Sequence, residues 1–97
     1  MRKSVAYLLG AFLIWGCASA PTQEMSDARQ ALQAAREVVD AAAPSASQEA
    51  VARADELLEA AELELGQGEY KAARLHANEA KALAIEARER AAGSTAN

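Results

Sequence analysis

The sequence predicts an all-α fold of three helices, in which the last two form an antiparallel hairpin, preceded by a cleaved signal peptide. Apolar residues recur at alternating spacings of three and four, which places them on one face of a helix. No alternating run of apolar and polar residues reaches the length of a strand. Gly66-Gln67-Gly68 separates two of the helical patterns, and because glycine readily adopts the left-handed conformation that ends helices, we expect the hairpin turn there. The chain of 97 residues is one domain at most.

The three helices have different start and stop signals. The first follows Pro21 and ends before Pro44, because the residue before a proline avoids the α region. The second is predicted over about 47–65, with a capping box at Ser45 and Gln48 or with Ser47 as the cap. The third is predicted over about 69–92. The predicted apolar faces are Met25, Ala28, Leu32, Ala35, Val39 and Ala42; then Val51, Ala54, Leu58, Ala61 and Leu65, widened by Ala50 and Leu57; then Tyr70, Ala73, Ala77, Ala80, Ala84, Ala87 and Ala91.

Charge differs between the second and third helices. The second carries six acidic residues and one arginine, whereas the third carries five basic and four acidic residues. We therefore expect the two helices to face each other without repulsion. Exposed pairs between them would contribute only about 0.2–1 kcal/mol each, so packing must drive folding.

The N-terminal segment has the organisation of a secretory signal. Arg2 and Lys3 precede an uncharged apolar stretch of 11 residues, Val5 to Trp15. A membrane span needs about 20 residues, so the stretch matches a signal-peptide core better than a transmembrane helix. We expect residues 1–16 to be the signal peptide, 17–21 a tether, 22–93 the helical domain and 94–97 a polar tail.

Cys17 is the only cysteine and cannot form an intramolecular disulfide. Ile14-Trp15-Gly16-Cys17 resembles the lipobox of bacterial lipoproteins. The resemblance implies cleavage before Cys17 and lipid on its thiol, the one covalent group expected, which would anchor the mature chain to a membrane. Because Ala18 rather than aspartate follows, the resemblance implies sorting to the outer membrane. The alternatives are cleavage after Ala18-Ser19-Ala20 by ordinary signal peptidase and retention of the segment as an uncleaved anchor.

Composition excludes several classes of function. Once Arg2 and Lys3 leave with the signal, eight basic residues face fourteen acidic ones, which argues against nucleic acid as a partner. His76 is the only histidine, and Glu79 is the one acidic residue three or four positions from it. We interpret this pair as part of a solvated face and expect no metal site. No set of side chains suited to nucleophilic catalysis is present, so we expect no enzyme.

Two further resemblances concern the hairpin. Gly68, Tyr70 and Ala73, preceded by Leu58 and Ala61, look like the G-x-Y-x-x-A pattern of a single tetratricopeptide repeat. The same motif, extended through Ala77 and Ala80 and combined with the lipobox, is similar to a family of small alanine-rich bacterial lipoproteins with a helical domain of unknown function. That resemblance implies an envelope location and a helical hairpin, and it supplies no activity and no catalytic residues.

These observations lead to two functional expectations. The first is a lipid-anchored helical interaction or spacer module that faces the periplasm and has a protein partner or self-associates, because a core made mostly of alanine buries little area. The alternative is a periplasmic peptide or ligand binder with a groove lined by Tyr70, Leu57 and Leu75. Tyr70 either packs within the hairpin or is an exposed anchor for a partner.

Overall fold

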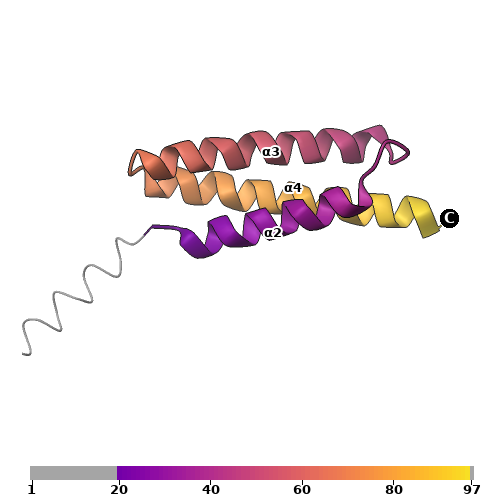
Figure 1. Ribbon diagram of the computed structural model, residues 1–97, viewed down its shortest axis with the longest axis horizontal. Coiled ribbons are helices and arrows are strands. Elements are labelled where there is room, and N and C mark those ends of the chain that lie inside the picture. Colours follow the sequence, from indigo (N-terminus) through magenta and orange to yellow (C-terminus); the bar gives the residue numbers. More distant parts are fainter. Residues whose placement is uncertain (1–19, 97) are drawn as a thin grey trace, which may run out of the picture.

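The computed structural model describes residues 20–96, with side chains placed through residue 93. These residues form three helices joined by short connections. They are α2 (Thr22–Val38), α3 (Ser45–Gly66) and α4 (Tyr70–Ala96), and the described residues contain no strand. Figure 1 shows α3 and α4 side by side, with α2 along the same pair. The all-α prediction with three helices is confirmed.

The first helix ends earlier than its apolar pattern predicts. Val39 is extended (φ −95°, ψ 95°), and in the connector the backbone N–H of Ala42 donates to Oδ1 of Asp40 over 2.9 Å. Aspartate competes with the helix in this way because its short side chain accepts a bond from the backbone two residues on. The predicted continuation of the buried face through Val39 and Ala42 is therefore wrong. Val39 is half-buried outside the helix, and Ala42 is exposed.

The start of α3 is also organised differently from the predicted capping box. Pro44 occupies the N-cap position, without a side-chain cap. The amide of Gln48 turns back to the connector, where Nε2 donates to the carbonyl oxygen of Ala43 over 2.9 Å and to that of Ala41 over 3.3 Å. Ser47 is buried, and its Oγ has no hydrogen-bond partner, so it is no cap either.

A short turn at Gly68 joins α3 to α4. Gly68 has φ +80°, in the left-handed region. Its N–H donates to the carbonyl oxygen of Leu65 over 3.1 Å, and the N–H of Glu69 donates to that of Glu64 over 2.9 Å. These two bonds form a Schellman motif, which satisfies carbonyl groups that the end of a helix leaves free. After this turn the chain reverses, and α4 runs back along α3 (Figure 1).

The last helix is longer than the sequence predicts. It includes Gly93 and continues to Ala96, so most of the predicted polar tail 94–97 is helical in its backbone. A glycine within a helix costs only about 1 kcal/mol relative to alanine, and Gly93 does not have the positive φ that ends α3 at Gly68. The residues from Ser94 to Asn97 include no proline, which would disfavour the helix.

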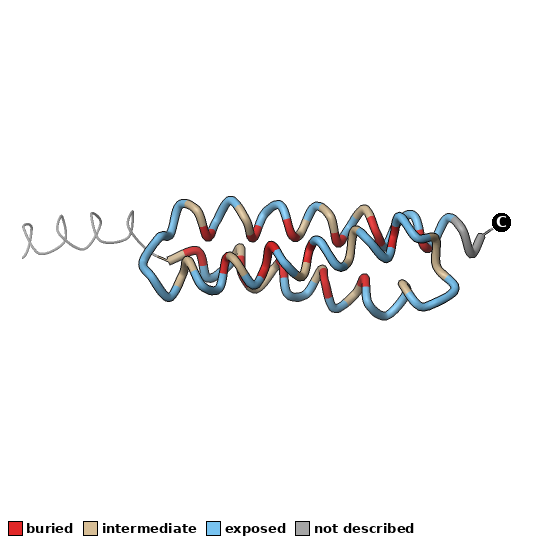
Figure 2. Tube along the Cα trace, turned by 90° about the horizontal axis from the view of Figure 1, so that it is seen from above, coloured by how far each residue is buried: buried red, intermediate tan, exposed pale blue. Residues whose placement is uncertain are grey.

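The core lies along the faces where the helices meet, and Figure 2 shows buried positions recurring along them. Helix α4 packs against both α2 and α3. Ten of the fourteen buried apolar residues are alanine, and six of these form the predicted face of α4. The four larger ones come from α2 and α3: Met25, Leu32, Leu57 and Leu58. The small side chains allow close approach of the helices and bury little area each.

Candidate functional site

One end of the bundle gathers the features that the sequence singles out. We call it the turn end: the start of α2 (residues 20–25), the end of α3 with its turn (62–69) and the start of α4 (70–75). Figure 1 places the beginning of α2 beside the turn between α3 and α4. The opposite end holds the connector between α2 and α3 and the last turns of α4. The chain therefore enters the bundle where α3 and α4 are joined.

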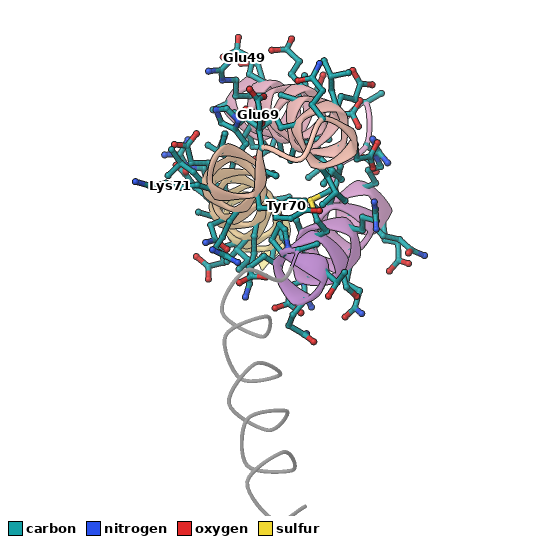
Figure 3. All side chains as sticks on the ribbon, turned by 90° about the vertical axis from the view of Figure 1, so that its left-hand side faces the viewer. Glu49, Glu69, Tyr70 and Lys71 are labelled. Carbon is teal, nitrogen blue, oxygen red and sulfur yellow. The ribbon has the colours of Figure 1, made fainter. Side chains whose placement is uncertain are left out.

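Tyr70 lies across the turn end, and Figure 3 shows its side chain pointing from α4 toward α2, whereas Lys71 points away from the bundle. The residue is 38% exposed. It lines an open hollow together with Leu75, Arg74 and Asn78 of the same helix and Glu64 of α3. Tyr70 therefore combines the two roles that the sequence left open, since part of it covers the bundle end and part faces solvent.

Leu57 does not belong to this hollow. It is 7% exposed and lies in the core, whereas Leu75 is 57% exposed and lines the hollow. The predicted groove of Tyr70, Leu57 and Leu75 is thus divided between the surface and the interior. The predicted widening of the apolar face of α3 by Leu57 explains this: adjacent Leu57 and Leu58 both face the other helices, so Leu57 does not reach a surface groove.

Ion pairs fasten α2 to the other two helices near the turn end. Nε of Arg74 lies 3.2 Å from Oε1 of Glu24. Nη2 of Arg29 lies 3.3 Å from Oε1 of Glu62. Helix α2 also pairs with α3 through Arg36–Asp55 at 2.6 Å, and with α4 through Asp27–Lys81 at 3.8 Å.

The acidic α3 and the more basic α4 share few ion pairs with each other. Among the described side chains, the one ion pair between α3 and α4 is His76–Glu64, and α2 supplies the other partners in both directions. Helices α3 and α4 do pack against each other, as expected, but most of the ion pairs between helices involve α2. Helix α2 presents arginines to the acidic α3 and carboxylates to α4.

His76 is a structural residue. Its Nδ1 lies 2.5 Å from Oε1 of Glu64 across the interface between α3 and α4, and its side chain is only 31% exposed. The interpretation of His76 with Glu79 as a solvated pair is therefore wrong. Spacing within one helix could not reveal a partner twelve residues away on another.

The described residues contain no group of three or more histidine, cysteine and acidic side chains able to hold a metal ion. Within the same range, no helix is both long and apolar enough to cross a membrane. The predicted lipidation site Cys17 and the cleavage residues Ile14, Trp15 and Gly16 lie outside the described residues. Ala20 and Pro21 are the first positions that the structure places, and Pro21 is fully buried.

No family model, curated protein or solved structure matches this chain.

Proposed function

We propose that the chain is a lipid-anchored protein of the bacterial cell envelope, held at the outer membrane by acyl chains on Cys17, and that its bundle is a helical interaction or spacer module facing the periplasm. The proposal rests on the lipobox-like Ile14 to Cys17 and on one structural observation. Pro21, four residues after Cys17, is already buried at the start of the bundle. Four residues span at most about 14 Å when fully extended, so an anchor at Cys17 would hold the bundle close to the membrane.

The dimensions of the helices support the spacer role. Helix α4 has 27 residues, which at 1.5 Å per residue is about 40 Å of continuous helix. It leads away from the turn end, where the tether enters (Figure 1). A bundle attached at this end would carry its connector end away from the membrane surface.

The composition of the core supports the interaction role. With ten alanines among fourteen buried apolar residues, the bundle buries little apolar area for its length. Val38 and Ile85, which lie away from the turn end, are 43% and 41% exposed. A protein partner or a second copy of the chain would add burial that the single chain lacks. The alternative, a peptide- or ligand-binding groove, has less support because Leu57 lies in the core instead of beside Tyr70.

The mass of the mature protein, extracted from membranes of a bacterial host, tests the anchor. We expect a chain that begins at Cys17 and carries acyl groups. The matched variant Cys17→Ser should lack them. A mass that begins at Pro21 and includes no lipid would refute the anchor, because it would show cleavage after Ala20.

Cross-linking in intact cells tests the interaction role separately. Adducts between two copies, or with a defined envelope protein, would support it. Recovery of the lipidated protein as a monomer alone would count against interaction and leave the spacer role.

A further inference from the structure

The arrangement of the chain around the turn end implies a second contact with the membrane. Resting on the proposed anchor at Cys17, we infer that the turn end lies against the lipid surface and that Tyr70, Leu63 and Leu75 contact the interfacial region of the bilayer. The partner that covers these three side chains is thus the membrane into which the acyl chains on Cys17 insert. The inference concerns the orientation of the bundle and adds a protein–lipid surface to the anchor itself.

Proximity is the first argument. The tether between Cys17 and the buried Pro21 extends no further than about 14 Å. The ion pair between Glu24 and Arg74 joins the start of α2 to the start of α4. Because this pair fastens together the two helices that begin at this end, the tether holds the turn as well as α2 near the lipid.

The distribution of exposed apolar side chains is the second argument. Five large apolar residues of the described side chains are exposed: Val38, Leu63, Tyr70, Leu75 and Ile85. Three of them, Leu63, Tyr70 and Leu75, lie at the turn end. At a rise of 1.5 Å per residue, Leu63 and Leu75 are within about 8 Å of the turn along their helix axes. The connector end has Val38 alone, and Ile85 lies midway along α4, beside Asp27 of α2. Exposed apolar area is therefore concentrated where the anchor would bring it to lipid.

Tyr70 has the chemistry suited to this position. A tyrosine has an apolar ring and a polar hydroxyl, and such side chains are enriched where a membrane meets water. Its ring lies across the end of the bundle (Figure 3), and 38% of the residue remains exposed. Part of Tyr70 is therefore open to the headgroup region while the rest covers the helices.

Tyrosine fluorescence provides a direct test, because Tyr70 is the only Tyr, Trp or Phe residue after position 17. The lipidated mature protein would be reconstituted into vesicles of phosphatidylethanolamine and phosphatidylglycerol, with or without bromine on the acyl chains near the headgroups. Bromine quenches nearby fluorophores. We expect Tyr70 to lose emission in brominated vesicles. We also expect aqueous iodide to quench Tyr70 less in the vesicle-bound protein than in the same protein in detergent-free solution after its acyl chains are removed.

A matched control moves the fluorophore to the other end. The double variant Tyr70→Leu, Ala41→Tyr places the one tyrosine in the exposed connector, and circular dichroism verifies that it remains helical. Its emission should be unaffected by brominated lipid and quenched by iodide.

The outcomes separate the two proposals. Equal emission of Tyr70 in both kinds of vesicle, from a protein whose mass confirms the acyl chains, overturns the orientation and leaves the anchor intact. Protection of Tyr70 from bromine and iodide alike also overturns it, and indicates that a second copy of the chain covers the turn end. A mass without lipid on Cys17 refutes the anchor, and the inferred orientation with it.

Discussion

Arg74 at the start of α4 pairs with Glu24 at the start of α2, with 3.2 Å between Nε and Oε1. The two residues are 50 positions apart in the sequence. At the turn end a short turn joins α3 to α4, but no turn joins α2 to either of them. The pair between Glu24 and Arg74 links α2 to α4 at this end. Both side chains are partly exposed, at 44% and 32%, so the pair affects the register of α2 more than the stability of the fold.

A double-mutant cycle with Glu24→Gln and Arg74→Gln should give a coupling free energy of about 0.2–1 kcal/mol at low salt, since exposed pairs are weak. Salt screens such charges, so the coupling measured by urea unfolding should fall as sodium chloride is raised. A coupling that does not change with salt would show that packing of the arginine stem, and not charge, joins the helices.

Gly68→Ala should destabilise the protein by about 1–2 kcal/mol, because a residue with a Cβ is strained in the left-handed conformation. No atom lies within 4 Å of the added Cβ, so the cost comes from the backbone alone. Gly66→Ala is the matched control, since Gly66 lies in α3 and also has open space around it. It should stabilise the protein by about 0.5–1 kcal/mol. Thermal unfolding followed by circular dichroism measures both, and equal effects at the two glycines would contradict the prediction.

Ala80→Leu should destabilise the bundle by about 1–3 kcal/mol or more, because the added side chain must push apart helices that meet at small residues. Ala80 is fully buried in the core cluster. Ala82→Leu, at an exposed position of the same helix, should change stability by no more than about 0.5 kcal/mol. If chemical denaturation gave similar values for the two variants, the alanine face of α4 would not be the packed one.

Ser47→Ala should stabilise the protein by about 1 kcal/mol, in contrast to most substitutions of buried residues. Its Oγ is buried without a hydrogen-bond partner, and an unsatisfied buried hydroxyl costs about 1–3 kcal/mol. Urea unfolding measures the effect. A marked loss of stability instead would show that the hydroxyl has a partner, such as a bound water molecule.

Much of the fold could be predicted because periodicity is a local property. The alternation of three and four places Ala73, Ala77 and Ala80 on one face of α4, and all three are fully buried. The hydroxyl and amide side chains near Pro44 were harder, because Ser45, Ser47 and Gln48 all fit a capping role in the sequence. The proline itself takes the N-cap position, which leaves Gln48 free to bind the connector.

The candidate site was predictable only in part, because its partners come from different helices. Tyr70 and Leu75 stand out in the sequence and do lie together at the turn end. Glu64 and Glu24 gave no signal, since their partners His76 and Arg74 are on other helices. The predicted apolar face of α2 does supply two of the largest core residues, Met25 and Leu32, but the sequence does not show which helices they contact.

The direction of α2 also determines how the bundle bears mechanical load. A pulling force applied through Ala20, with the last turns of α4 held, acts along the axis of α2 and away from the bundle (Figure 1). Met25 and Leu32 must then slide past their neighbours at the same time, together with the ion pairs at Glu24 and Arg29. This is loading in shear, which distributes the force over all these contacts, whereas peeling would break them one by one. We therefore expect the bundle to resist tension along this axis better than its small core would indicate.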